Sequence, residues 1–309
     1  MKIKEWAAFA ALGLIWGTSF LWIKIAVGET GPFTLVAFRL LFAAAGLAVV
    51  MLVKRQRLPR DRRTLLKYGF MGLVNTALPF VLITWAEQHI ASSLASIMNA
   101  TVPLFTIVIA HFWLQDEKIT AGRLGGLLLG FVGILVLVSR DLDAQTFTGA
   151  LTGMGLLGQG AMLLAVISYA TGITFSRRYL RNQPPVLQAG LVVIIADALV
   201  WGVTPVVERP LNLPDSAMAW FAIVWLGVLG SCVAYLLFFY LINAWGPTRA
   251  SLVTYVFPVI GLVLGLIFLN EPADWRLLAG SLLIVGGLAV VNLKRQAKRE
   301  VRAATAGAD

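Results

Sequence analysis

The sequence is poor in the residues on which metal sites, disulfides and catalytic clusters depend. It contains one cysteine, Cys232, and two histidines among 309 residues. A lone cysteine cannot form an internal disulfide, so the fold does not depend on one. His, Cys, Asp and Glu residues do not occur with metal-ligand spacing, and no phosphate-binding loop is present. We therefore expect no metal, no cofactor and no ATP-dependent step.

Charged residues are scarce as well. They make up 13% of the chain, while hydrophobic residues make up 59% and the mean hydropathy is +0.84. Soluble domains have roughly 25% charged and 45–50% apolar residues. A soluble core of this size would not hide so much apolar surface, so lipid is the expected solvent for most of the chain.

The long apolar runs predict ten transmembrane helices, because about 20 mostly apolar residues cross a bilayer. Their expected ranges are 6–26, 33–53, 68–86, 92–114, 121–138, 156–175, 186–206, 217–241, 249–269 and 275–293. They are too long, and lack the alternation, for an outer-membrane barrel.

Lysine and arginine orient these spans. The net charge is +10, but the basic residues lie in short loops, which is typical of a topology signal and argues against nucleic acid. Twenty of the 25 lie on the side of the N-terminus and three on the opposite side. This asymmetry predicts a multi-pass protein of a bacterial-type inner membrane with both termini in the cytoplasm.

The two halves of the sequence resemble each other. Each has small residues that open a span, a proline about eight residues further and a glutamate beyond the end, as Pro103 with Glu117 and Pro258 with Glu271 show. We expect one five-helix repeat over 1–142, a second over 143–295, and a disordered cytoplasmic tail over 296–309. Because five is odd, the repeats are inverted, an architecture typical of secondary transporters with a central substrate site.

Several motifs resemble the drug/metabolite transporter superfamily, EamA branch. They are Ile15-Trp16-Gly17-Thr18-Ser19-Phe20, Phe38-Arg39-Leu40, Ala91-Ser92 through Pro103 to Glu117, and Pro258 through Leu269-Asn270-Glu271-Pro272. The resemblance extends from Trp6 to Leu293. It implies ten helices around a central cavity and efflux of small metabolites. Among the family's members, the chain is most similar to amino acid exporters, including those for aromatic amino acids.

Polar and aromatic residues within the spans are the candidates for the cavity lining. They are Trp16, Ser19, Arg39, Asn75, Trp85, Asn99, Tyr169, Tyr235 and Tyr255. Polar residues in lipid usually face other helices, so interhelical packing, or an interfacial belt for Trp85, is the alternative. As a set they favour zwitterions or apolar cations over phosphorylated substrates.

Specific roles are predicted for two ionisable residues and two prolines within the spans. Arg39 either lines the cavity or ties helix ends together, since a charge at this depth must face protein or water. Asp197 could carry a coupling proton, pair with Arg39, or be a protonated packing residue. Pro103 and Pro258 are expected to kink their helices, as hinges or as static bends. Glu117 and Glu271 are expected to cap helix ends or to pair with loop cations.

The sequence thus predicts a secondary transporter that exports amino acids or related metabolites by alternating access. An exporter of hydrophobic cations or drugs is the main alternative, and a passive channel or a membrane-embedded enzyme fits less well. The expected partners are a small-molecule substrate and membrane lipid, and the protein is expected to be a monomer or a homodimer.

Overall fold

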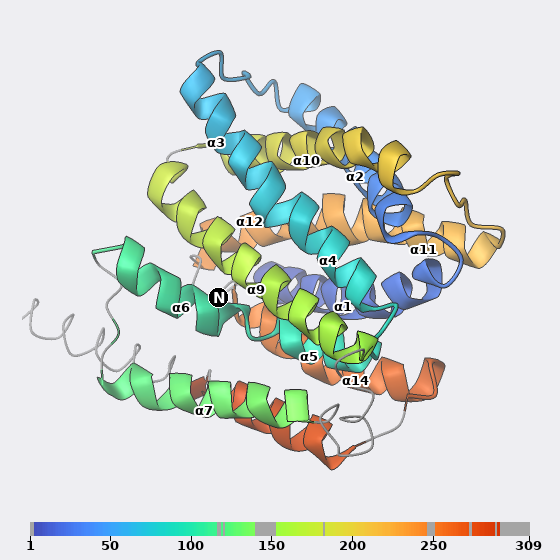
Figure 1. The fold of residues 1–309 in the computed structure, drawn as a ribbon. Helices are drawn as coiled ribbons and strands as arrows, with labels where there is room; N and C mark the ends of the chain where they lie inside the picture. The colour runs from blue at the N-terminus through green and yellow to red at the C-terminus, as the bar shows by residue number, and fades with distance from the viewer. Residues whose placement is uncertain are drawn as a thin grey trace, which may run out of the picture.

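The computed structural model is helical, with no strand among the residues that it describes (Figure 1). These residues are 3–115, 119, 121–139, 153–181, 183–245, 251–271, 274–287 and 289–290. In chain order the helices are α1 (Ile3–Val27), α2 (Pro32–Val53), α3 (Arg62–Gly72), η1 (Leu73–Ala77), α4 (Leu78–Ala86), α5 (Ser92–Asn99), α6 (Val102–Trp113), α7 (Ala121–Val138), α9 (Met154–Tyr179), α10 (Pro185–Val207), α11 (Ala217–Gly227), η4 (Val228–Val233), α12 (Ala234–Trp245), η5 (Ser251–Val256), α14 (Phe257–Phe268) and Trp275–Gly287.

Seven helical segments in the described part of the chain are long and apolar enough to cross a membrane. They are Ile3–Val27, Pro32–Val53, Arg62–Ala86, Ser92–Trp113, Met154–Tyr179, Pro185–Val207 and Ala217–Phe238. Three shorter apolar helices, Leu124–Leu137, Phe257–Phe268 and Trp275–Gly287, lie within the other three predicted spans. The all-helical, multi-pass class is confirmed, while the count of ten spans stays a prediction.

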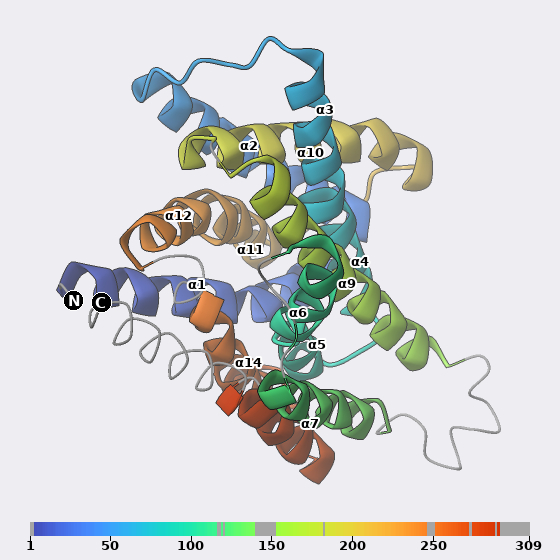
Figure 2. The same cartoon turned by 90° about the vertical axis from the view of Figure 1, so that its left-hand side faces the viewer.

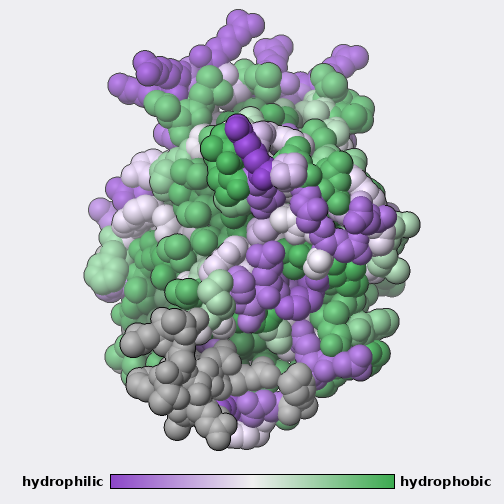
Figure 3. Space-filling model, turned by 45° about the vertical axis from the view of Figure 1, so that its right-hand side comes forward, coloured by the Kyte–Doolittle hydropathy of each residue, from purple (hydrophilic) through white to green (hydrophobic). Residues whose placement is uncertain are grey.

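The outward faces of these helices are apolar. Leu135 and Phe268, for example, are 67% and 64% exposed. Figure 3 shows hydrophobic residues over much of the visible flank, with hydrophilic residues gathered at the top and across the middle. Helices that are apolar on all faces are expected where lipid, not water, surrounds the protein.

Helices from early and late parts of the chain pack against each other. The most extensive contact joins α2 to α10, and α4 packs on α9 as α1 does on α11. In both ribbon views α7 lies beside the last described helix, Trp275–Gly287 (Figures 1 and 2). A Cβ on Gly133 would lie 2.9 Å from the Gly280 carbonyl oxygen, so small residues permit this close approach.

Four spans are interrupted. The π-helix η1 separates α3 from α4, and η4 separates α11 from α12. Turn residues separate α5 from α6, where Pro103 lies in the first turn of α6, and the 3₁₀-helix η5 precedes α14, where Pro258 lies in the first turn. Proline is tolerated there because the first N–H groups of a helix have no intrahelical partner. Both prolines therefore start helical segments; whether they act as hinges stays a prediction.

Candidate functional site

Arg39 lies at the centre of a buried polar cluster. Only 5% of its surface is exposed. Its Nε donates a hydrogen bond of 3.0 Å to Ser231 Oγ on η4. The guanidinium carbon is 3.9 Å from the ring centroid of Phe80 on α4, a cation–π contact. Arg39 thereby connects α2, α4 and η4.

Three more ionisable side chains interact electrostatically with Arg39. They are Tyr169 on α9, Tyr235 on α12 and Glu87 at the end of α4. Three predicted cavity residues, Arg39, Tyr169 and Tyr235, are thus brought together from helices far apart in the sequence. Glu87 was not among the predicted residues.

Glu87 is buried although it follows the last residue of α4. Its exposed fraction is 0%, and neither carboxylate oxygen has a hydrogen-bond partner among the described residues. The Lys24 ammonium donates to the backbone carbonyl oxygens of Glu87 and, over 2.8 Å, of Ile90. Lys24 therefore covers the end of α4 with a cation, which suits the negative end of a helix dipole.

The two π-helices expose backbone carbonyls to side chains of neighbouring helices. Ser168 Oγ on α9 donates to the Val74 carbonyl in η1 over 2.6 Å. Trp16 Nε1 on α1 donates to the Gly230 carbonyl in η4 over 3.0 Å. The rings of Trp16 and Tyr235 also meet edge to face at 6.4 Å. A π-bulge frees carbonyls from regular helix bonding, and such bulges are frequent at functional sites.

The other predicted cavity residues lie in less connected positions. Asn75 in η1 packs so closely on α9 that a Cβ on Gly172 would be 2.7 Å from its side chain. Ser19 Oγ donates to Ile15 within α1, and Trp85 stacks edge to face on His89 at 4.6 Å. Asn99 is the last residue of α5.

Asp197 has no described contact with the Arg39 cluster. Asp197 lies on α10 with one carboxylate oxygen buried and without a hydrogen-bond partner among the described residues. The described contacts of the Arg39 guanidinium are with Ser231 and Phe80, not with Asp197. The side chain of Tyr255 lies outside the described residues.

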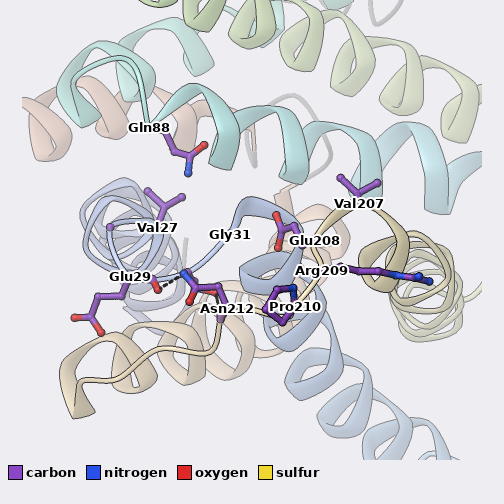
Figure 4. Close-up of a pocket in the computed structure, with 11 residues that line it drawn as sticks. Val27, Glu29, Gly31, Gln88, Val207, Glu208, Arg209, Pro210 and Asn212 are labelled. Atoms are coloured by element: carbon purple, nitrogen blue, oxygen red, sulfur yellow. Dashed lines mark hydrogen bonds between the residues drawn. The ribbon is translucent and has the colours of Figure 1, made fainter.

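A pocket of about 440 Å³ opens between loops at one end of the helices. We call it the loop pocket, and it is lined by Val27, Gly28, Glu29, Thr30, Gly31, Gln88, Val207, Glu208, Arg209, Pro210 and Asn212. Figure 4 shows Glu208 directed toward the loop at Gly31, while Arg209 extends away from it. None of the predicted cavity residues lines this pocket.

Three carboxylates join loops and helix starts at this end of the molecule. Glu208 accepts from the N–H groups of Phe33 (2.8 Å) and Thr34 (2.9 Å) at the start of α2. Glu271 accepts from the N–H groups of Ser92 (2.6 Å) and Ser93 (3.1 Å) at the start of α5. Carboxylates suit helix N-termini because unpaired N–H groups and the positive dipole end lie there.

The third carboxylate, Glu29, binds the start of α11. It accepts from Ser216 N–H over 2.9 Å and from Ser216 Oγ over 2.6 Å. The hydrogen bonds from the Ser216 hydroxyl and N–H lower the pKa of Glu29. Of the two roles predicted for Glu271, helix capping is observed, at the start of α5. We call the contacts of Glu29, Glu208 and Glu271 the carboxylate caps.

Sequence reasoning missed Glu29, Glu87 and Glu208, although a usable signal exists. The chain has only 15 acidic residues, and these three lie directly beyond the ends of apolar runs. An acid in so short a loop has few alternatives to a helix N-terminus, as Glu29 and Glu208 show, whereas Glu87 accepts no such hydrogen bond among the described residues. Which helix each one would reach depends on tertiary packing and is not visible in the sequence.

Comparison with known proteins identifies the family. The EamA-like transporter family model matches residues 5–139 and, separately, 156–293. The chain belongs to the EamA-like transporter family. The predicted family resemblance is confirmed, and the family is one of membrane transporters.

Relatives of this EamA-like transporter extend over most of its length. An uncharacterized transporter of Archaeoglobus fulgidus is 26% identical over 95% of this chain and 100% of its own length. The uncharacterized inner membrane transporter YedA of Escherichia coli is 30% identical, over 84% and 80% respectively. A protein of known crystal structure has the same fold, with a TM-score of 0.67 and 21% identity over 95% of this chain and 99% of its own.

Proposed function

We propose that this EamA-like transporter exports amino acids or related small metabolites across the inner membrane by alternating access. The observation that carries the proposal is the buried Arg39 cluster, because it draws on helices from both regions that the family model matches. A charged side chain buried in a membrane bundle is expected where a polar substrate passes.

We infer further that the chain has ten spans in two inverted five-helix halves. Two separate family matches support two related halves. The π-helices η1 and η4 support it too, because each interrupts the third span of its half under the ten-span numbering. Two pseudo-equivalent halves can exchange conformations, so that one site opens alternately to either side.

The carboxylate caps supply a candidate closure at the end away from the N-terminus. The excess of lysine and arginine in the opposite loops supports placing this end outside the cytoplasm. Under this proposal, the observed contacts of Glu29, Glu208 and Glu271 hold the outer side shut, and release of substrate requires that they separate.

The aromatic surroundings of Arg39 support amino acids over the other substrate classes. Phe80, Tyr169 and Tyr235 offer ring faces and phenol groups beside one cation. A transporter of hydrophobic cations, the second candidate, needs no buried arginine. A passive channel needs no repeat, and an enzyme needs a wider set of acids and histidines than the described residues place around Arg39.

A panel of substrates tests the proposal. Purified protein in liposomes should take up labelled amino acids in a saturable manner, and labelled hydrophobic cations should be taken up more slowly. Faster uptake of the cations would favour the second candidate, and uptake of neither class would contradict both.

Asp197 is the proposed residue for proton coupling, and the same liposomes test it. Asp197→Asn should abolish the dependence of uptake on a pH gradient while uptake driven by a substrate gradient persists. An unchanged dependence on the pH gradient would exclude this role.

A further inference from the structure

Arg39 and Glu87 are two buried ionisable side chains that the described structure leaves short of hydrogen-bond partners. The one described hydrogen bond of the guanidinium uses Nε, so its two NH₂ groups have no hydrogen-bond partner among the described residues. Both oxygens of Glu87 lack a hydrogen-bond partner among the described residues. The two side chains attract each other electrostatically but form no ion pair with each other.

Burying two such side chains costs free energy unless a third group supplies the missing hydrogen bonds. Burying an ionisable group without a compensating partner is unfavourable, because the group loses its hydration. Here both side chains are buried, with exposed fractions of 5% for Arg39 and 0% for Glu87. A ligand that carries one negative and one positive group would compensate both at once.

We propose that Arg39 and Glu87 together bind an α-amino acid as a zwitterion. The NH₂ groups of Arg39 hold its carboxylate, and the carboxylate of Glu87 holds its ammonium group. Guanidinium is suited to this role because its planar donors match a carboxylate in a two-pronged geometry. The assignment rests on the proposed function and names the atoms that select the substrate.

The other charged groups near Glu87 are already engaged. Lys24 donates to two backbone carbonyls, and Glu271 accepts from Ser92 and Ser93. Ring surfaces lie on the Arg39 side, where Phe80 contacts the guanidinium and Tyr169 is within electrostatic range. The substrate side chain would lie against these rings, which favours apolar or aromatic amino acids.

The loop pocket lies next to this pair along the chain. Gln88, the residue after Glu87, lines the pocket, and so does Gly31 at the start of α2. Glu208 lies between the pocket and α2, where it caps Phe33 and Thr34. The loop pocket is therefore the outlet that we assign to the site when this cap separates.

The test compares three inhibitors of labelled L-phenylalanine uptake into proteoliposomes. Unlabelled phenylalanine has both charges, phenylalaninamide lacks the carboxylate, and 3-phenylpropionate lacks the ammonium group. With wild-type protein, the inhibition constant of each analogue should be at least about tenfold higher than that of phenylalanine. Each analogue loses one charge-assisted hydrogen-bonded contact. Equal inhibition of the wild-type protein by all three compounds would by itself overturn the zwitterion site.

Variants assign each charge to its residue. Glu87→Gln should lose the discrimination against 3-phenylpropionate and keep that against phenylalaninamide, and Arg39→Gln should do the reverse. Asp61→Asn, which changes an exposed acid at the start of α3 to another capping residue, should keep both. If both variants weaken all three ligands equally, the residues support the fold and do not read the charges. If wild-type protein takes up no amino acid, the proposed function fails with the site, whereas uptake without discrimination overturns the site alone.

Discussion

At the scale of single residues, Gly31 leaves room for the carboxylate that caps α2. A Cβ at this position would overlap the Glu208 carboxylate, and a Cβ on Gly265 would overlap that of Glu271 in the same way. Asn270, which directs Glu271, has a φ of 50°, a left-handed conformation that asparagine tolerates better than most residues. Small and permissive residues therefore fix two of the three carboxylate caps.

Gly31→Ala should displace Glu208 and weaken the closure of this end. We expect a loss of stability of about 1–3 kcal/mol, because two N–H groups at the start of α2 lose a charged acceptor. Denaturant unfolding in detergent measures the change. Gly202→Ala is the matched control, because nothing lies within 4 Å of a Cβ there, and a loss as large as that of Gly31→Ala would contradict the interpretation.

The cap at Glu29 predicts a defined pH dependence. Its hydrogen bonds with Ser216 lower its pKa, so the contact stabilises the folded protein above the ordinary glutamate pKa of about 4.3 and weakens as pH falls through the lowered pKa. Labelling of Gln88→Cys by a water-soluble thiol reagent, divided at each pH by that of the exposed Arg57→Cys to remove the intrinsic pH dependence of thiol reactivity, should be constant between neutral pH and pH of about 5, and rise only in stronger acid. Glu29→Gln should remove that acid-induced rise; a rise centred near neutral pH would point to a different group.

At the scale of helical elements, the sequence predicted the positions of the helices better than their irregularities. The described helices agree closely with most of the predicted spans, because apolar run length and the flanking Gly, Pro and charged residues are local signals. The π-helices η1 and η4 were not predicted. Their freed carbonyls are satisfied by Ser168 and Trp16 of distant helices, and such contacts leave no periodic trace in the sequence.

The same distinction explains the candidate site. Arg39 was predicted because a charge within an apolar run is conspicuous. Glu87 was not, because it stands in a polar stretch, Glu87-Gln88-His89, that has the composition of an ordinary loop. Its burial results from packing of α4 with α9 and α2, which only the folded chain reveals.

Ser168→Ala should show how much the hydrogen bond from Ser168 to η1 contributes to the stability of the folded protein. It leaves the Val74 carbonyl without its described partner, at a cost of about 1–3 kcal/mol. The free energy of unfolding in detergent is the measurement. Thr171→Ala on the same helix is the control, because the described hydrogen bond of the Thr171 hydroxyl is an exposed one to Ile167 of its own helix. Equal losses in the two variants would show that the π-helix contact has no special weight.

At the scale of the whole molecule, the proposed alternating access depends on movement between regions that the carboxylate caps hold together. Glu29 precedes α2, whereas its partner Ser216 precedes α11. Alternating access requires these loops to part during each cycle. A covalent link between them should therefore stop transport without unfolding the protein.

Crosslinking Glu29→Cys with Ser216→Cys tests this requirement. Cys232 is the sole native cysteine, so Cys232→Ala gives a background without other thiols. A short thiol-specific crosslinker should reduce uptake at least about tenfold in the double variant, and a cleavable linker should restore it on reduction. Each single cysteine variant should be unaffected by the reagent. Full transport by the linked protein would show that this end need not open.

The central claim is that this EamA-like protein carries amino acids by exposing one site alternately to each side. Counterflow measures this most directly: liposomes loaded with unlabelled L-phenylalanine are diluted into a trace of the labelled compound. The account predicts transient accumulation of label above its equilibrium level, saturable with external substrate and dependent on the internal load. Label that only equilibrates, at a rate proportional to concentration and independent of the load, would contradict it.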